Sequence, residues 1–336
     1  MFLRLDNVAR SIQFRHARDK VIQNQLPPLA RSALDRDYLL RANPELFSVL
    51  RSQGNSFALL MHQGKVLLGQ NSALSLIPLS AAPESNVSVY LGKSIEETSS
   101  VAKGSAICLV VIDNAQASLI EPNSENWISL RATGAGLSDF DTGIFTQALA
   151  LSNWHQSHTH CPSCGSQTVL EQGGWVRRCN AEELELFPRT DPAVIVSIVD
   201  QRDRILLGSQ GIWEENRWSI LAGFVEPGES LEAAVVREME EESGLVVTDP
   251  KYIYSQGWPY PYSLMLGFSA KANSDQPLRP DGTEIAKLRW FSREELEAEA
   301  KDILLPGRAT ISRAMIELWF GKELVSATET ASHGKH

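Results

Sequence analysis

The stretch GFVEPGESLEAAVVREMEEESGL, residues 223–245, decides the fold of the chain around it. Pro227 and Gly228 predict a turn after a strand that ends at Gly223. A helix is expected from about Ser230 to Glu242, because apolar residues recur there at helical spacing. The side chains expected to face a core are Leu231, Ala234, Val235 and Met239.

Three glutamates of this helix, Glu238, Glu241 and Glu242, stand at positions i, i+3 and i+4 and therefore share one face. Like charges on neighbouring turns repel one another. A fully solvated acidic face explains most runs of this kind. Hard divalent cations offer the other explanation, since Mg²⁺ prefers carboxylate oxygens and keeps several of its waters.

The longer pattern decides between these two explanations. The spacing is Gly, five residues, Glu, seven residues, Arg-Glu, an apolar residue, any residue, Glu-Glu, any residue, Gly and an apolar residue. The stretch fills each slot and so resembles the signature of the Nudix hydrolases. The slots are filled by Gly223, Glu229, Arg237, Glu238, Met239, Glu241, Glu242, Gly244 and Leu245.

This resemblance implies a Nudix fold, an α/β or α+β arrangement in which helices sandwich a mixed β-sheet. It implies that Glu238 and Glu242 bind Mg²⁺ or Mn²⁺, and that Glu241 is either a ligand or the general base. Glu229 is expected to fold back from the loop towards the cluster and is the other candidate for the general base, with Arg237 pairing to a carboxylate. The implied reaction is attack of water on a diphosphate phosphorus, for which metal ions lower the pKa of the water and a carboxylate accepts the proton.

Downstream lies SQGWPYPYS, residues 255–263. A mixture of aromatic residues and proline is usually a packed loop, but this one resembles the SQPWPFPxS signature of NADH pyrophosphatases within the Nudix superfamily. It departs from that signature at Gly257 and at Tyr260. The resemblance implies that the segment lines a dinucleotide site through Gln256, Gly257, Trp258, Pro259, Tyr260, Pro261, Tyr262 and Ser263.

Further positions match the same subgroup. Phe187, in FPRTDP, and Phe224 are expected to stack on the two faces of the adenine, as aromatic rings do at modest entropic cost. Glu284 resembles a third metal-binding glutamate. Ser312 and, on a looser match, Arg131 are expected to contact substrate.

The subgroup resemblance implies hydrolysis of NADH or NAD⁺ to NMN(H) and AMP, and removal of NAD caps from RNA is a further activity of such enzymes. Two alternatives remain open. One is a Nudix hydrolase for ADP-ribose, coenzyme A or diadenosine polyphosphates. The other is a non-catalytic Nudix module that senses a nucleotide, although such modules usually lose box carboxylates and none is lost here.

Three of the four cysteines, Cys161, Cys164 and Cys179, lie close together in the sequence and indicate a metal site rather than a disulfide framework. NADH pyrophosphatases commonly carry a zinc ribbon at this place, but Glu182 stands where the fourth cysteine would be. Zinc held by three thiolates with Glu182, His158 or His160 is one interpretation. A ribbon that folds without metal is another, and a redox role is a third.

The domain order follows from these motifs. We expect an N-terminal Nudix-like α+β domain over 1–135, a linking helix over 136–158 with Asp141 as N-cap, and a cysteine module over 159–190. A Nudix domain over 191–325 and a disordered tail over 326–336 complete the chain. Within the Nudix domain, 193–199 and 205–208 predict a hairpin, and Ser292 with Glu295 predicts a capping box.

Composition limits the partners. The 336 residues carry a net charge of −10, with a pI near 5.3, which argues against bulk nucleic-acid binding through Lys and Arg. No targeting segment or membrane-spanning run is expected, so the sequence predicts a cytoplasmic protein. The subgroup resemblance implies a homodimer.

Overall fold

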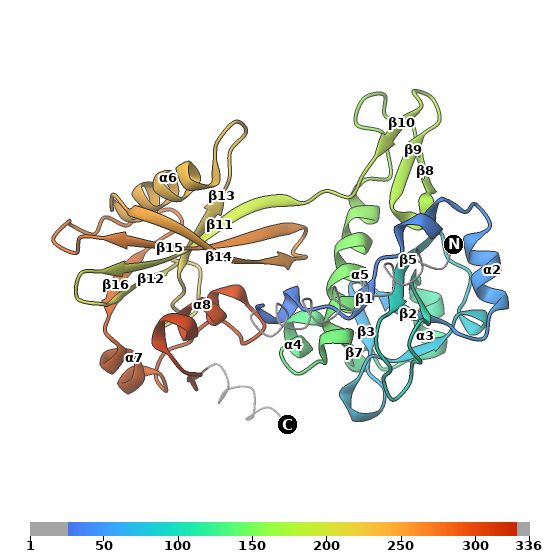
Figure 1. Ribbon diagram of the computed structural model, residues 1–336, viewed down its shortest axis with the longest axis horizontal. Coiled ribbons are helices and arrows are strands. Elements are labelled where there is room, and N and C mark those ends of the chain that lie inside the picture. Colours follow the sequence, from blue (N-terminus) through green and yellow to red (C-terminus); the bar gives the residue numbers. More distant parts are fainter. Residues whose placement is uncertain (1–25, 328–336) are drawn as a thin grey trace, which may run out of the picture.

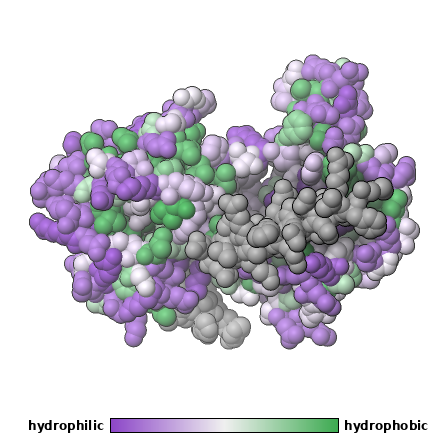
Figure 2. Space-filling model, viewed as in Figure 1, coloured by the Kyte–Doolittle hydropathy of each residue, from purple (hydrophilic) through white to green (hydrophobic). Residues whose placement is uncertain are grey.

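The computed structural model describes residues 26–327 and contains two lobes, each built around a β-sheet (Figure 1). The N-terminal lobe holds a seven-stranded sheet and the C-terminal lobe a six-stranded sheet, and a three-stranded sheet projects beside helix α5. The face drawn in Figure 2 is mostly hydrophilic, with apolar patches over the C-terminal lobe. None of the described helices is long and apolar enough to cross a membrane.

The N-terminal sheet has the order β1-β5-β6-β2-β3-β7, with β4 paired to β2. Its pairs are antiparallel except β2 with β6, which run parallel. The strands are β1 (Leu34–Asp35), β2 (Ser56–His62), β3 (Lys65–Leu67), β4 (Leu76–Pro78), β5 (Val87–Ser94), β6 (Ala106–Val111) and β7 (Trp127–Ser129). The helices are α2 (Leu46–Ser52), α3 (Asn114–Ile120) and α4 (Leu130–Thr133), with short 3-10 turns η1 (Pro28–Ala30), η2 (Tyr38–Ala42), η3 (Gln70–Ser72), η4 (Leu79–Ala81) and η5 (Ser124–Asn126).

Helix α5 (Asp139–Ser157) is the helix expected to link the lobes, and it is buried along most of its length. Ile144, Phe145 and Ala148 pack into the same core as strands β2, β5 and β6. The prediction of Asp141 as its N-cap is wrong. Ser138 is the N-cap, and its hydroxyl accepts the backbone N–H of Asp141, so the helix begins three residues earlier than a cap at Asp141 would place it.

The cysteine module follows α5 directly. Its sheet has the order β10-β9-β8 and consists of β8 (Thr168–Glu171), β9 (Val176–Cys179) and β10 (Leu184–Leu186), with turn η6 (Gln172–Gly174) between the first two. Arg177 attaches this sheet to α5, since its guanidinium donates to Thr168 and to Nδ1 of His155.

The C-terminal sheet has the order β14-β15-β11-β12-β16, with β13 paired to β11. Strand β11 runs parallel to β15, and the predicted hairpin between β11 and β12 is confirmed by the antiparallel pair Val199–Ile205. The strands are β11 (Asp191–Asp200), β12 (Ile205–Ser209), β13 (Leu221–Phe224), β14 (Thr248–Trp258), β15 (Ser263–Ala272) and β16 (Lys287–Phe291).

Two helices cover opposite faces of this sheet, as a mixed sheet between helices requires. Because successive side chains of a strand point to opposite faces, Val194 and Val196 pack with α6 (Leu231–Ser243), whereas Ile195 packs with α8 (Ile311–Phe320). Helix α7 (Arg293–Glu299) begins at the predicted capping box of Ser292 and Glu295.

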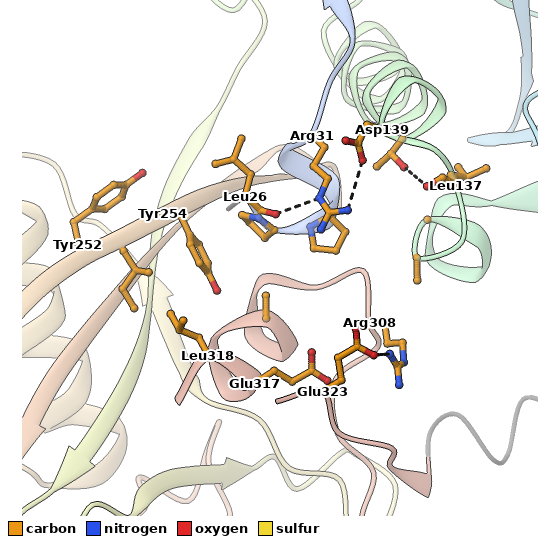
Figure 3. Close-up of a pocket in the computed structure, with 17 residues that line it drawn as sticks. Leu26, Arg31, Leu137, Asp139, Tyr252, Tyr254, Arg308, Glu317, Leu318 and Glu323 are labelled. Carbon is orange, nitrogen blue, oxygen red and sulfur yellow. Dashed lines mark hydrogen bonds and ion pairs between the residues drawn. The ribbon is translucent and has the colours of Figure 1, made fainter. Parts of the chain in front are cut away.

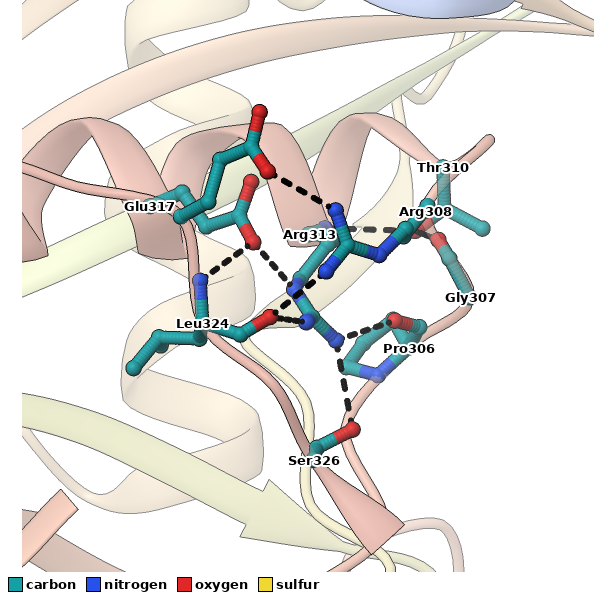
Figure 4. Close-up of polar contacts among 9 residues, drawn as sticks. Pro306, Gly307, Arg308, Thr310, Arg313, Glu317, Leu324 and Ser326 are labelled. Carbon is teal, nitrogen blue, oxygen red and sulfur yellow. Dashed lines mark hydrogen bonds and ion pairs between the residues drawn. The ribbon is translucent and has the colours of Figure 1, made fainter. Parts of the chain in front are cut away.

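The end of the chain departs from expectation. Residue 326, predicted to open a disordered tail, is a fully buried serine. Arg313 of α8, itself inaccessible to solvent, donates to the hydroxyl of Ser326 and to the carbonyls of Pro306 and Leu324 (Figure 4). These bonds hold residues 324–326 against the lobe. The remainder of the predicted tail, from residue 328, lies outside the described residues.

Candidate active site

Helix α6 has defined ends, so the helical periodicity of its residues is fixed and the predicted carboxylates lie on one face. Ser230 is the N-cap, and its hydroxyl accepts the backbone N–H of Ala233. At the other end Gly244 adopts a left-handed conformation with φ of 72°, which a residue without Cβ accepts most readily. Ala234, Val235 and Met239 are fully buried, as predicted, so the opposite face of the helix is directed away from the core.

Arg237 organises the loop that precedes the helix. Its guanidinium donates to both carboxylate oxygens of Glu229, at 2.8 and 2.9 Å, and to the carbonyl of Phe224 at 2.9 Å. It also pairs with Glu238 at 3.0 Å and Glu241 at 2.9 Å. Arg237 lowers the pKa of the Glu229 carboxyl. The predicted folding back of Glu229 and the pairing of Arg237 are thus both present.

Gly223 makes room for Glu238. A Cβ added at residue 223 would lie 2.0–2.3 Å from the carboxylate atoms of Glu238, far inside any real contact. The carboxylate therefore lies against the backbone of β13. The glycine of the box is required by the position of a side chain fifteen positions later in the chain.

Glu242 is the most confined carboxylate of the cluster, with 6% of its surface exposed and Oε2 without a hydrogen-bond partner among the described residues. Burial, together with the charges of Glu238, Glu284 and Asp281, raises the pKa of Glu242 to about 8. A cation bound here would relieve both the desolvation of the charged form and the mutual repulsion. The donor set, all carboxylate oxygen, fits a hard divalent ion.

Glu284 lies outside the helix but close to this cluster, since its charge raises the pKa values of both Glu238 and Glu242. Asp281, which sequence analysis did not single out, shapes the turn by accepting the backbone N–H groups of Glu284 and Ile285. An Asp three residues before a candidate ligand in a Gly-containing loop is the signal that could have identified it.

A cavity of about 490 Å³ lies on the other face of the sheet, beside α8. Among the predicted substrate residues, Arg131, Trp258 and Ser312 line it. Sequence analysis missed the β12–β13 loop, which contributes Trp213 and Arg217. Two tryptophans within six residues of a polar loop were the available signal. The other lining residues include Ile195, Trp218, Ser219, Met265, Pro306, Gly307, Thr310 and Ile311.

One pair of strands, β11 and β13, lies between the cavity and the carboxylate cluster. A backbone hydrogen bond joins the Glu242 carboxylate to Ala222. Ala222 pairs with Ile195 in the sheet, and Ile195 lines the cavity. The cavity and the carboxylate cluster therefore lie on opposite faces of the sheet at the same strand pair.

The aromatic segment 255–263 forms the end of the β14–β15 hairpin, and its residues divide between two environments. Trp258 lines the cavity, and Gln256 is buried with its amide donating to the carbonyl of Ala309. Trp258 and Ser263 are paired across the hairpin. Gly257 faces Thr146, at 3.8 Å from an added Cβ to the threonine methyl.

The tip of the same hairpin contacts the N-terminal lobe instead. The carbonyls of Pro259 and Pro261 accept hydrogen bonds from the Asn153 side chain, at 3.0 and 3.2 Å. The guanidinium carbon of Arg131 lies 3.9 Å from the ring centre of Tyr260, a cation–π contact. Tyr262 contacts Arg189 and His158. The prediction that the entire segment lines the substrate site stays a prediction, and the structure adds that Asn153, Arg131, Arg189 and His158 contact its residues 259–262.

Phe187 and Phe224 are exposed by 64% and 60%, high values for large apolar side chains. Phe224 is the last residue of β13 and pairs with Ala193 near the start of β11. Phe187 lies between β10 and β11. Both rings therefore belong to segments at the same end of β11. Exposed rings of this kind are available for stacking on a base.

The cysteine module brings its three thiols together. The sulfur atoms of Cys161, Cys164 and Cys179 all lie within 4.8 Å of one another. The fourth thiol, Cys108, is buried in β6, and burial raises its pKa to about 12. A cluster of three thiols fits zinc, for which thiolate is the preferred ligand.

A larger cavity, about 960 Å³, lies elsewhere, between η1, the start of α5, strand β14 and α8 (Figure 3). Its lining includes Arg31 paired with Asp139, and Arg308 paired with Glu323. None of the predicted catalytic or substrate residues lines it, and its charged side chains are largely paired with one another. Size alone therefore does not mark it as the site.

Family models match three consecutive parts of the chain. One described as the NADH pyrophosphatase-like rudimentary NUDIX domain covers residues 55–154, one described as the NADH pyrophosphatase zinc ribbon domain covers 156–187, and the NUDIX domain covers 189–314. Their order is the order of the N-terminal lobe, the cysteine module and the C-terminal lobe.

Curated relatives cover part of the chain. A protein named NAD-capped RNA hydrolase NudC from Mycobacterium tuberculosis is 41% identical over 203 residues, 57% of this chain and 64% of that protein. NAD-capped RNA hydrolase NUDT12 from Homo sapiens is 36% identical over 54% of this chain and 42% of its own length. The chain thus matches less than two thirds of either relative.

Among solved structures, a NUDIX hydrolase from Nitrosomonas europaea matches 49% of this chain and 94% of its own, with 25% identity and a TM-score of 0.37, which is too low to assign a fold by itself. The three family models, taken with the complete box on α6, establish the assignment. The chain belongs to the Nudix superfamily and carries the domain set of its NADH pyrophosphatase family.

Proposed function

We propose that this protein hydrolyses the diphosphate of NADH or NAD⁺ to NMN(H) and AMP, with Mg²⁺ or Mn²⁺ as the activating ion. One observation carries the proposal. A confined carboxylate cluster and an aromatic-walled cavity lie on either side of the strand pair Ala222–Ile195. A dinucleotide has the corresponding parts, a diphosphate between two nucleosides. The volume of about 490 Å³ is in the usual range for a small-molecule site.

Glu238, Glu242 and Glu284 are the proposed metal ligands. When bound, the divalent ion would lower the pKa of an attacking water and neutralise charge on the diphosphate. Glu242 supports this assignment because its buried Oε2 lacks a protein partner. Gly223 supports the role of Glu238 by admitting its carboxylate to the strand backbone.

The hydrogen bonds of Arg237 reduce the choice of carboxylate that could act as the general base. Both oxygens of Glu229 accept hydrogen bonds from Arg237, so Glu229 is better suited to holding the loop. Glu241 keeps 60% of its side chain exposed and pairs with Arg237 through Oε2. We propose Glu241 as the group that takes the proton from water as the P–O–P bridge opens and the bridging oxygen leaves with one nucleotide.

The cavity residues are proposed to bind one nucleoside of the substrate. Trp258 and Trp213 offer aromatic faces, Ser312 a hydroxyl and Arg131 a fixed positive charge. Arg131 is held over Tyr260 and Trp258, so its position requires both lobes. Phe187 and Phe224, exposed at the end of β11, are proposed to stack on the adenine of the other nucleoside.

The names of the two relatives extend the proposal to RNA. Both are named as hydrolases of NAD-capped RNA, and such a cap presents the same diphosphate as free NAD. We propose removal of NAD caps as a second activity of the same site. We also propose a homodimer in the cytoplasm, with domain boundaries near residues 135, 158 and 190.

The test is release of AMP by the full chain with Mg²⁺ or Mn²⁺. We expect NADH or NAD⁺ to be turned over in preference to ADP-ribose, coenzyme A and diadenosine polyphosphates. Turnover of one of those compounds with none of NADH would leave a Nudix hydrolase and refute the substrate. No turnover of any of them would favour a nucleotide-sensing module.

Glu242→Gln tests the ligand assignment within that assay. Losing a ligating charge should lower turnover by about 100-fold or more. Glu240→Gln is the matched control, because Glu240 is an exposed glutamate on the same helix outside the cluster, and its activity should equal that of the parent. Turnover within a few-fold of the parent for Glu242→Gln would show that the ligand assignment is mistaken.

A further inference from the structure

The cysteine module has two turns of matching spacing. The first carries Cys161 and Cys164, and the second carries Cys179 and Glu182, again three residues apart. The first turn connects α5 to β8, and the second connects β9 to β10. In the second turn a carboxylate therefore stands at the position that a thiol occupies in the first.

Both turns are folded around their sulfur atoms. The sulfur of Cys179 accepts backbone hydrogen bonds from Ala181 and Glu182, and the sulfur of Cys164 accepts one from Ser166. In both turns backbone groups approach a sulfur, and in the second turn a carboxylate stands where the first has its other thiol.

Two distances within the module lie near those of a tetrahedral zinc site. With Zn–S near 2.3 Å and Zn–O near 2.1 Å, two ligands at the tetrahedral angle lie about 3.8 Å apart for a sulfur pair and about 3.6 Å for sulfur and oxygen. The sulfurs of Cys164 and Cys179 are 3.5 Å apart. Cys161 Sγ lies 4.0 Å from Oε2 of Glu182.

The neighbouring histidines are engaged elsewhere. Nδ1 of His158 lies 2.9 Å from the hydroxyl of Ser157, and its ring packs beside Trp154 and Tyr262. Nδ1 of His160 lies 3.0 Å from the hydroxyl of Thr159. Among the described residues, the group whose ligand atoms lie within 4.8 Å of one another contains the three sulfurs alone, so a fourth ligand has to move in when zinc binds, and the Glu182 carboxylate starts 4.0 Å from the sulfur of Cys161.

We propose that Glu182 is the fourth ligand of a zinc site in this module, completing a set of three thiolates and one carboxylate. The site differs from a four-cysteine ribbon in having a hard oxygen donor at one corner, and zinc generally favours the softer thiolate in structural sites. The metal should therefore be held less tightly than in a four-thiolate site. The proposal concerns the module alone and stands apart from the proposed hydrolase activity.

The experiment measures zinc in the full-length protein, purified without chelators, and its retention against increasing concentrations of a chromogenic chelator. The parent should carry about one zinc per chain. Glu182→Gln should weaken zinc binding by about 10-fold or more, and Glu182→Cys should strengthen it beyond the parent. Glu183→Gln is the control, since it makes the same charge change one residue away.

Cobalt substitution provides a readout independent of retention and of enzymatic activity. The thiolate-to-cobalt absorption should rise by about one third from parent to Glu182→Cys, as three thiolates become four. A protein that folds but contains less than about a tenth of an equivalent of zinc would refute the proposal. So would equal zinc retention by Glu182→Gln and the parent, an unchanged cobalt spectrum in Glu182→Cys, or loss of zinc on His160→Ala in place of Glu182→Gln.

Discussion

Gly223→Ala isolates the role of one contact in the carboxylate cluster. The added methyl carbon would lie 2.0, 2.1 and 2.3 Å from Cδ, Oε2 and Oε1 of Glu238, whereas real Cβ contacts are essentially never under 3.0 Å. The carboxylate must therefore move by about 1 Å, a displacement that can cost about 100-fold in catalysis. This corresponds to about 2.7 kcal/mol of transition-state stabilisation.

The same substitution should have little effect on stability. The clashing atoms are the end of a flexible side chain, which can swing away, and alanine is favoured over glycine within a strand by roughly 0.5–1 kcal/mol. We expect the free energy of unfolding, measured with urea, to stay within about 1 kcal/mol of the parent. Loss of activity would then not result from unfolding.

The assay follows AMP release from NADH under saturating Mg²⁺, with unfolding measured on the same preparations. Gly211→Ala is the control, because its added Cβ would make only an ordinary contact, 3.7 Å from the Ala286 side chain. Full activity of Gly223→Ala would refute the reasoning, since the carboxylate of Glu238 could then leave β13 without consequence. A large loss of stability would also refute it, because it would show that strand β13 is distorted while the Glu238 side chain stays in place.

Two further predictions concern the cavity and the module. Trp213→Ala should raise KM for NADH by about 10-fold with kcat little changed, since it removes part of the cavity wall and no charged group. Ile212→Ala, at a position 91% exposed, is the control. A fall in kcat at constant KM for Trp213→Ala would contradict the assignment of Trp213 to substrate binding. Burial, with Arg177 donating to Nδ1, lowers the pKa of His155 from 6.5 to about 4. Because the folded state resists protonation, this contribution to stability is present above pH 6.5 and is lost as pH falls towards 4, about 3 kcal/mol in all. Urea unfolding from pH 7 to pH 4 should therefore show a shallower loss for His155→Gln than for the parent, and parallel curves would contradict the shift.

Local signals predicted the local structures well. The start of α6 near Ser230, its apolar spacing and the capping box of α7 all depend on residues within one or two helical turns. The face shared by Glu238, Glu241 and Glu242 follows from helix geometry alone. The start of α5 was misplaced because both Ser138 and Asp141 have a side-chain oxygen that can cap a helix. The structure uses Ser138, three residues before the predicted cap.

Residues that meet across large sequence separations could not be derived in this way. Arg131 and Trp258 share a cavity wall although 127 positions separate them. Asn153 contacts the tip of the β14–β15 hairpin from the other lobe. The aromatic segment therefore places Trp258 in a cavity wall and its tip against the N-terminal lobe, an arrangement that its own sequence does not contain, because it depends on where that lobe lies.

The sequence by itself determined the class of chemistry, since the spacing of the box fixes which carboxylates share a helix face and which glycines the turns require. It also determined that the cysteine module lacks one thiol. Tertiary structure alone decided that Glu242 is buried beside the charges of Asp281 and Glu284, that Trp213 and Arg217 join the cavity, and that Glu182 approaches the sulfur of Cys161. The physical reason is one of range: backbone periodicity and capping act over a few residues, whereas burial, charge coupling and metal geometry depend on how distant segments pack together.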